Sequence, residues 1–286
     1  MNTERKIEKV LLIVNLHKDD SRILMGEIKD ELERRNIRVT TCAFEKRPSE
    51  DPTGTYDLAF SLGGDGTVLY SARCMAPFKV PLFPINLGTL GFIAAIQKND
   101  WLSIFTAYAQ GTLHVSSRLM LDIRIERDGR EYKRLNCLND AVVSASGIAK
   151  IIRLQVGTEN IRLGRYQSDG LIVATPTGST AYSVAAGGPI LDPEMDAMII
   201  NPICPFTLSN RPIVVPAQET IYVEIENEQR SGVLLTVDGQ VVEPLQSGDR
   251  IHIQRAHYRA HLVASDRNVF YRVLRTKLNW SGGPDA

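Results

Sequence analysis

The sequence predicts two structural classes in one chain, an α/β domain followed by an all-β domain. Residues 9–15, KVLLIVN, are almost continuously apolar, as in a parallel strand that is covered on both faces. Strand-like and helix-like segments then alternate as far as about residue 112, which is typical of a doubly wound parallel sheet. Beyond this point short strand-like segments follow one another with little helical character, which favours a β-sandwich.

The N-terminal third is expected to alternate strand and helix. Strands are predicted at residues 9–15, 38–44, 56–62 and 80–87, and helices at 21–36, 68–76 and 101–109. In the first helix Ile23, Ile28 and Leu32 mark a buried stripe. Residues 45–55 contain two prolines and a glycine and are predicted to form a loop. Ligands of such a sheet bind at the carboxyl ends of its strands, so function is expected there.

The rest of the chain is expected to be rich in strands. Asp128 and Gly129 separate two strand-like segments, 119–127 and 131–138, and indicate a hairpin. Further strands are predicted at 151–156, 161–163, 171–174, 220–226, 233–237, 250–254 and 261–264, with helical character near 180–186 and again at 268–278. The expected domains are therefore 1–112, to which residues 265–286 return, and 113–264.

Composition excludes several classes of partner. Lys plus Arg and Asp plus Glu both number 33 in the 286 residues, so the formal net charge is zero. No basic tail or stripe indicates binding to nucleic acid or a membrane surface. The apolar run at 10–14 is too short for a signal peptide, and no stretch approaches the roughly 20 apolar residues of a membrane span. The four cysteines form no CxxC pair, as expected of reduced, mostly buried thiols in a cytoplasmic protein, and the histidines have no zinc-site spacing.

The strongest functional signal is GGDGT at residues 63–67, which ends an expected strand and precedes an expected helix. Its glycines let a phosphate approach bare N–H groups, and the helix dipole favours negative charge there. It is neither a Walker A loop nor a GxGxxG motif. A carboxylate in such a place indicates that Asp65 meets a hydroxyl or a metal ion, unless it merely caps a tight turn. The segment therefore favours phosphate transfer from a nucleotide to a small-molecule hydroxyl.

Two further segments are rich in hydroxyl, amide and carboxyl groups. In TPTGSTAYS at 175–183 and AAGGP at 185–189, small residues permit close approach of a ring or ribose, and hydroxyls supply neutral donors and acceptors. A long crossover loop would account for the same composition. Asn139 and Asp140, at the expected end of a strand, could hold the two hydroxyls of a ribose or a nucleobase amine, although a plain turn is the simpler interpretation.

Together these segments resemble the NAD kinases over nearly the whole chain. The landmarks occur in that family's order: GGDGT at 63–67, NLGTLGF at 86–92, ND at 139–140, DG at 169–170, and 175–189. GGDGT is shared with diacylglycerol and sphingosine kinases and, in variant form, with phosphofructokinases, whereas the 175–189 combination is specific to NAD kinases. The resemblance implies an α/β domain and a β-sandwich with the active site between them. It also implies phosphorylation of the adenosine ribose 2′-hydroxyl of NAD, with ATP and a divalent cation, usually Mg²⁺, in a homodimer or homotetramer.

The resemblance also implies roles for individual residues. Asp65 would be the catalytic base, which orients the attacking hydroxyl and takes its proton late. Residues expected to face phosphates are Gly63, Gly64, Gly66 and Thr67, and Lys150 matches a position that carries a basic or imidazole group in relatives. Residues expected to contact NAD are Asn139, Asp140, Asp169, Thr180, Ala181, Tyr182, Ser183 and Ala185, with Gln240, from an Asp238-Gly239-Gln240 landmark, as a weaker candidate. Phe92 is expected on adenine or in the core, and no protein ligand of the metal is assigned.

This chain departs from the family pattern at a few of these positions. Relatives often have Glu where this chain has Asp140, which keeps the charge but has a shorter reach, and many have Ser where it has Ala185, so one hydrogen bond is missing. Gln167 stands where some relatives have Arg.

Three other functions fit parts of the pattern. A lipid kinase of the diacylglycerol type uses the same GGDGT, but no amphipathic or polybasic segment here suggests membrane docking. A non-catalytic NAD-binding regulator would keep the pocket without the chemistry, and the presence of Asp65 argues against it. A dehydrogenase ranks last, because the chain lacks GxGxxG and a catalytic His or Tyr-Lys arrangement.

Overall fold

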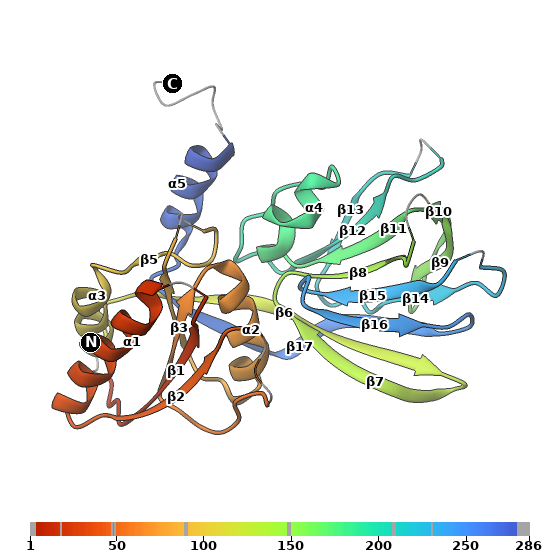
Figure 1. The fold of residues 1–286 in the computed structure, drawn as a ribbon. Helices are drawn as coiled ribbons and strands as arrows, with labels where there is room; N and C mark the ends of the chain where they lie inside the picture. The colour runs from red at the N-terminus through yellow and green to blue at the C-terminus, as the bar shows by residue number, and fades with distance from the viewer. Residues whose placement is uncertain are drawn as a thin grey trace. The chain divides into compact units, whose positions relative to one another are not determined.

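The computed structural model describes residues 4–17, 19–46, 48, 50–88, 91–147, 150–207, 210–229 and 231–278 (Figure 1). The chain divides into two compact units: unit 1 is Met1–Arg118 with Tyr258–Ala286, and unit 2 is Leu119–His257. The sequence places the domain boundaries at 112–113 and 264–265. The two units instead divide inside strands β6 (Val115–Arg127) and β17 (Arg250–Val263).

Unit 1 contains the predicted parallel sheet. Its strands are β1 (Lys9–Asn15), β2 (Arg38–Phe44), β3 (Leu58–Gly63), β4 (Leu82–Asn86) and the short β5 (Ile96–Gln97). The order is β2-β1-β3-β4, with β5 and the end of β17 also paired to β4, and each of these pairs is parallel. The α/β class predicted for this part is confirmed.

Helices cover both faces of this sheet. The covering helices are α1 (Asp19–Arg34), α2 (Asp65–Met75) and α3 (Trp101–Ala109), and unit 1 also contains the 3₁₀ turn η1 (Ala76–Phe78) and the helix α5 (Arg267–Leu278). One core cluster joins alternate strand residues to α1 and α3. The buried residues of α2 are not part of it and face β3, β4 and β1, so α2 covers the opposite face.

The predicted buried stripe of α1 is correct at two of its three positions. Ile28 and Leu32 are fully buried, but Ile23 is 65% exposed, and Leu24 takes its place. Leu24, Ile28 and Leu32 are spaced four residues apart and share one face of the helix. Ile23 precedes Leu24 by one residue and therefore lies on a different face.

Unit 2 consists of antiparallel strands in two sheets. One sheet contains β10 (Arg162–Ser168), β9 (Ile152–Thr158), β14 (Ile221–Ile225) and the first part of β17, and β6 pairs with β17 and with β7 (Arg130–Cys137). The other has the order β13 (Ile213–Pro216), β12 (Ala197–Ile203), β11 (Gly170–Ala174), β8 (Asp140–Ala145), β15 (Val233–Val237) and β16 (Val241–Leu245).

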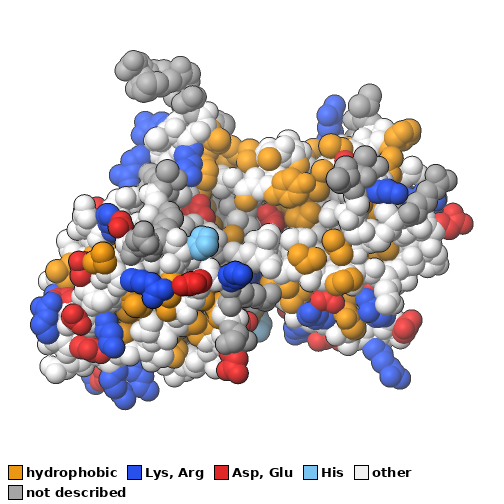
Figure 2. Space-filling view, in the orientation of Figure 1, with side chains coloured by type: hydrophobic (Ala, Val, Ile, Leu, Met, Phe, Trp, Pro, Cys, Tyr) orange, Lys and Arg blue, Asp and Glu red, His pale blue; other side chains and the backbone are white. Residues whose placement is uncertain are grey.

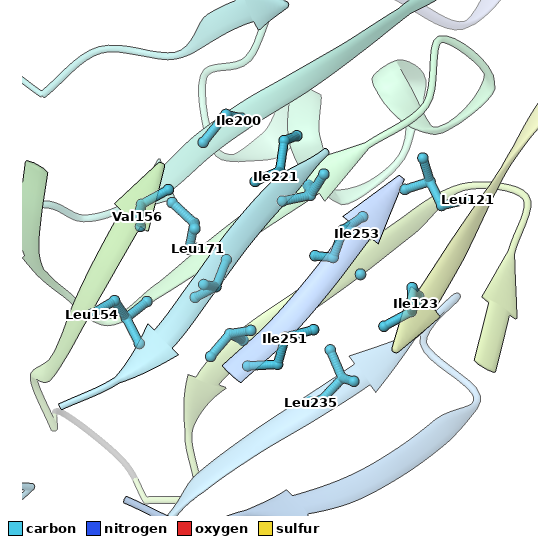
Figure 3. Close-up of a cluster of buried hydrophobic side chains, with 14 of the residues drawn as sticks. Leu121, Ile123, Leu154, Val156, Leu171, Ile200, Ile221, Leu235, Ile251 and Ile253 are labelled. Atoms are coloured by element: carbon cyan, nitrogen blue, oxygen red, sulfur yellow. The ribbon is translucent and has the colours of Figure 1, made fainter. Parts of the chain in front are cut away.

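The inner faces of the two sheets form one apolar core (Figure 3). Leu154, Ile221 and Ile253 come from the first sheet, and Leu171, Ile200 and Leu235 from the second. Residues of both sheets alternate between buried and more exposed positions in strands such as β14 and β15, as in a sandwich with one solvated face. The predicted β-sandwich is confirmed.

Two Asp-Gly turns close hairpins in this unit. Asp128 and Gly129 have φ of 51° and 72° between β6 and β7, as the sequence predicted. Asp238 and Gly239 have φ of 50° and 64° between β15 and β16. Both pairs adopt the left-handed conformation that a type I′ turn requires.

Several strands and one cysteine differ from what the sequence predicted. The two strands expected at 250–254 and 261–264 are one strand, β17, and β8, β12, β13 and β16 were not predicted. Cys74 and Cys137 are buried and Cys42 is half-buried, but Cys204 is exposed. Every helix in the described part of the chain is too short or too polar to cross a bilayer.

Candidate active site

The GGDGT segment forms the junction between β3 and α2. β3 ends at Gly63, Gly64 is the extended N-cap with φ of −106°, and α2 begins at Asp65, three residues earlier than predicted. A Cβ at Gly63 would overlap the Thr67 side chain, so this glycine allows the tight turn into the helix. A Cβ at Gly64 would have no neighbour within 4 Å, and Gly66 is exposed, so the start of α2 is open on this side.

The Asp65 carboxylate has a structural role that the sequence did not reveal. It accepts hydrogen bonds from the backbone N–H groups of Phe92 at 2.9 Å, Ile93 at 3.2 Å and Ala94 at 2.9 Å. It therefore anchors the segment after β4 to the first turn of α2. A Cβ at Gly91 would fall on this carboxylate, so only glycine allows the approach. Because a carboxylate has about four lone-pair sites, room is left for one further donor such as a hydroxyl.

Phe92 connects this anchor to the C-terminal helix. Its ring centroid lies 6.2 Å from that of Phe270 on α5, and the Lys277 ammonium lies 5.5 Å from the centre of the Phe92 ring. Exposed basic side chains, including Arg272 and Arg275, gather over α5 (Figure 2). Of the expected NLGTLGF landmark, Thr89 and Leu90 lie outside the described residues.

In unit 2, Asn139 and Asp140 lie where β7 gives way to β8, close to the strand end that the sequence predicted. β7 ends at Cys137 and β8 begins at Asp140. Their side chains are buried, with 8% and 4% exposure, and the Asn139 Oδ1 atom has no hydrogen-bond partner among the described residues. A buried acceptor without a partner is costly, which makes this oxygen a candidate for binding a ligand donor. Burial, and then the negative charge of Asp238, raise the pKa of Asp140 to about 7.

The segment after β11 lies directly against this dipeptide. The pairing of Ala174 with Asp140 brings Thr175 beside Asn139, whose carbonyl oxygen accepts from the Thr175 N–H at 2.8 Å. The Thr175 hydroxyl donates to the Leu138 carbonyl at 2.6 Å and accepts from the Gly178 N–H at 3.0 Å. A Cβ at Gly178 would overlap the Asn139 backbone, so the turn η2 (Thr177–Thr180) depends on this glycine.

The predicted pocket residues that follow have different environments. Tyr182, which begins the short helix α4 (Tyr182–Ala185), is 49% exposed and free to stack. Ser183 is fully buried, and Asn201 of β12 donates to its carbonyl at 2.9 Å and its hydroxyl at 3.3 Å. Ser183 therefore supports the turn from inside. Thr180 and Ala181 are half-buried and Ala185 is exposed.

Asn201 was missed by sequence reasoning. It lies fully buried in the otherwise apolar strand AMIINPI, and a polar residue in such a strand is the signal that could have identified it.

Two predicted site residues of unit 2 lie at the other end of its sheet. In the ladder between β8 and β11, Ala174 pairs with Asp140, whereas Gly170 pairs with Ser144. Asp169 is therefore about five residues, or about 17 Å, from Asp140 along the strands. Lys150 follows the end of β8 on the same side as Asp169. Gln240, in the turn after β15, belongs to the Asp140 end, because Val237 pairs with Ala141.

The raised pKa of Asp140 predicts a pH-dependent stability. The folded chain keeps a proton to about pH 7 that the unfolded chain releases near pH 4, so the free energy of unfolding falls as pH rises between these values. Asn does not titrate, so the stability of Asp140→Asn relative to wild type should rise over the same interval, by about 4 kcal/mol at most. Urea unfolding at several pH values measures this, with exposed Asp128→Asn as control. A pH-independent difference would contradict it.

The described residues lack the clusters of side chains that bind metal ions. No group of three or more His, Cys, Asp or Glu in the described part of the chain could hold a metal ion. Mg²⁺ commonly binds one or two carboxylates together with substrate phosphates, so a cation carried by a nucleotide needs no larger protein site. The remaining lone pair of Asp65 fits such a cation as well as it fits a hydroxyl.

Comparison with known proteins identifies two family domains in the chain. The sequence profile of the ATP-NAD kinase N-terminal domain matches residues 46–113, and that of the C-terminal domain matches residues 138–265. The chain belongs to the ATP-NAD kinase family. Among relatives, it is 40% identical over 277 residues to an NAD kinase of Treponema denticola, covering 96% of this chain and 98% of the relative. It is 41% identical to an NAD kinase of Geobacter sulfurreducens over 81% of both chains.

Solved structures of the family share the fold. Yeast NADH kinase in complex with NADH superposes with a TM-score of 0.85 at 26% identity, covering 98% of this chain and 90% of that chain. An NAD kinase of Archaeoglobus fulgidus in complex with ATP has a TM-score of 0.72 at 23% identity over 96% of this chain and 99% of that chain, a likeness of fold alone.

Proposed function

We propose that this chain transfers the γ-phosphate of ATP to the adenosine ribose 2′-hydroxyl of NAD, with Asp65 as the catalytic base. Membership of the ATP-NAD kinase family makes it a phosphotransferase that phosphorylates NAD. The residue assignment depends on the Asp65 carboxylate. Asp65 lies in the first turn of a helix that follows a parallel strand, and three backbone N–H groups from another segment fix the orientation of its carboxylate. The relatives described above support neither a lipid kinase nor a non-catalytic regulator.

The start of α2 suits the phosphates of ATP. Phosphoryl transfer depends mainly on positioning and charge neutralisation, and a helix N-terminus contributes to both through its dipole and its N–H groups. The open side at Gly64 and Gly66 gives a phosphate access to these groups. Gly63 and Thr67 act by closing the turn, since the Thr67 side chain is buried against Gly63.

Asp65 is preorganised for a single task at the hydroxyl. Three of its lone pairs are occupied by N–H groups, which fix the orientation of the carboxylate before substrate arrives. The remaining one accepts the hydroxyl proton, so the ribose oxygen can attack the γ-phosphorus as that proton leaves, while the bond from the γ-phosphorus to the bridging oxygen breaks and ADP departs. Mg²⁺ bound to ATP would neutralise phosphate charge.

The residues around Asn139 suit the dinucleotide. The unpartnered Asn139 Oδ1 and the Asp140 carboxyl can accept from ribose hydroxyls or an adenine amine, and the exposed Tyr182 ring can stack on a base. Other contacts are assigned to Thr180, Ala181, Ala185 and Gln240, whereas the buried Ser183 supports the turn from inside. Asp169 and Lys150 lie too far along the sheet to share one ribose with Asp140, and we assign them to the nicotinamide end and to a phosphate.

Oligomeric state and location are also part of the expected function. As the family resemblance implies, we expect a cytoplasmic homodimer or homotetramer, and light scattering coupled to size-exclusion chromatography measures its mass.

An acceptor and donor panel tests the activity. Purified protein is incubated with Mg²⁺, a donor (ATP, GTP, UTP, CTP or polyphosphate) and an acceptor (NAD, NADH or diacylglycerol). NADP formation is followed with an NADP-specific dehydrogenase, and phosphorus NMR locates the phosphate on the 2′-oxygen. Binding of NAD without NADP from any donor would overturn the proposal, and phosphatidic acid from diacylglycerol would favour the lipid kinase.

A further inference from the structure

The carboxylate of Asp238 holds the backbone that leads from β7 into β8. It accepts hydrogen bonds from the consecutive N–H groups of Leu138, Asn139 and Asp140 at 3.1, 2.7 and 3.3 Å. The Asp238 N–H in turn donates to the Asp140 carbonyl at 2.9 Å. Asp238 is 6% exposed, and its left-handed φ of 50° turns the side chain back toward this segment. One residue thus holds four polar groups of the backbone.

Thr175 holds the two carbonyl groups that remain. Its hydroxyl donates to the Leu138 carbonyl at 2.6 Å, and its N–H donates to the Asn139 carbonyl at 2.8 Å. Asp238 and Thr175 therefore pair every backbone N–H and C=O of residues 138–140. Since buried backbone groups must be paired, this segment keeps one conformation only while both partners are present.

The clamp leaves the Asn139 Oδ1 atom unused. That atom is buried without a partner among the described residues, so the backbone contacts, rather than any bond to this oxygen, set its direction. We infer that Asp238 is a positioning residue for NAD binding, which acts through the backbone of Asn139 and Asp140, with Thr175 as the second half of the clamp. This inference rests on the proposed function, which assigns those two side chains to NAD.

The chain contains a matched control for Asp238. Asp128 occupies the same position of the other Asp-Gly turn, with φ of 51° and a following left-handed glycine, but it is exposed. Replacing either Asp by Asn changes the same residue in the same backbone conformation. The two changes differ in one respect. At Asp238 the change replaces the oxygen that accepts a hydrogen bond from the Leu138 N–H by an amide NH₂ group, which cannot accept one.

Amide hydrogen exchange without ligand tests the clamp independently of any activity. In Asp238→Asn we expect the amides of residues 138–140 to exchange at least about tenfold faster, while Asp128→Asn leaves them unchanged. Thr175→Val removes the hydroxyl at equal size and should weaken the same segment, whereas Thr175→Ser keeps the hydroxyl and should resemble wild type. Unchanged exchange in both Asp238→Asn and Thr175→Val would overturn the clamp.

Steady-state kinetics and NAD titration test the positioning. We expect Asp238→Asn to raise KM and Kd for NAD about tenfold, with KM for ATP within about twofold of wild type and Asp128→Asn unchanged in both. A merely structural role would lower the thermal stability and leave the NAD constants of the folded enzyme unchanged, which would overturn the inference. If wild type formed no NADP, the proposed function would fail, while exchange and calorimetric NAD titration would still decide the role of Asp238.

Discussion

Replacing Asp65 by Asn is expected to lower the turnover number by at least about 10²-fold, within the 10²–10⁴-fold range typical of general-base removal. The Asn amide cannot take the hydroxyl proton. Its NH₂ group would also face backbone N–H groups whose hydrogen bonds the Asp65 carboxylate accepts in the wild type. The variant should therefore also melt at a lower temperature, because the segment from Phe92 to Ala94 loses part of its anchor. Rapid-quench kinetics, NAD calorimetry and thermal melts measure the three effects, with NAD affinity expected within a few-fold of wild type.

One control variant separates the chemical loss from the structural one. Asp57 also anchors backbone, accepting from the N–H groups of Glu8 and Lys9 at 2.8 Å each, so Asp57→Asn should lower stability without lowering turnover. Gly91→Ala places a methyl group on the Asp65 carboxylate and displaces the base, so it should lower both stability and turnover. If Asp57→Asn lost as much turnover as Asp65→Asn, or if Asp65→Asn turned over normally, the base assignment would be wrong.

Gly178→Ala adds a single methyl group and is expected to weaken NAD binding strongly. The new Cβ would overlap the Asn139 carbonyl oxygen and lie 2.6 and 2.8 Å from the Asn139 C and Cα atoms. Because these are backbone atoms, no rotation of a side chain relieves the clash, and overpacking of this kind costs about 1–3 kcal/mol. We expect a lower melting temperature and a KM for NAD raised at least about tenfold, measured by scanning calorimetry and steady-state kinetics.

Gly26→Ala is the matched control for this substitution. Gly26 lies within α1, where a Cβ would meet nothing within 4 Å, so the change should stabilise the protein by about 0.5–1 kcal/mol and leave kinetics unaltered. Normal NAD affinity in Gly178→Ala would show that the contact between Gly178 and Asn139 does not matter for binding.

The fold was predictable where periodicity and turn chemistry agreed. The apolar strand at 9–15, the helix at 101–109 and the Asp128-Gly129 hairpin were each predicted at or close to their observed positions. Strands such as β12 and β16 were not, because proline interrupts their patterns at Pro202 and Pro244. The segments 250–254 and 261–264 form one continuous strand, β17, because they pair with strands that are far away in the sequence. Local sequence patterns do not report such pairing.

The site was predictable as a set of residues but not as a set of contacts. The GGDGT spacing identified Asp65, yet its bonds to the segment after Gly91 join residues 27 to 29 positions apart. Asp238 is separated from Asn139 by 99 positions, and no local pattern reports that its carboxylate, unlike that of the exposed Asp128, accepts hydrogen bonds from this distant backbone. The separation of Asp169 from Asp140 likewise follows from strand register, which the sequence does not state.

The placement of both unit boundaries inside β6 and β17 bears on how this gene can be divided. A split at either boundary would cut a hydrogen-bonded strand and leave both halves with unpaired edges, which promote aggregation. Neither boundary offers a protease an exposed loop, so limited digestion should not release the two units intact. Chimaeras that exchange unit 2 between relatives would therefore need joints outside these strands, with both whole strands taken from one parent.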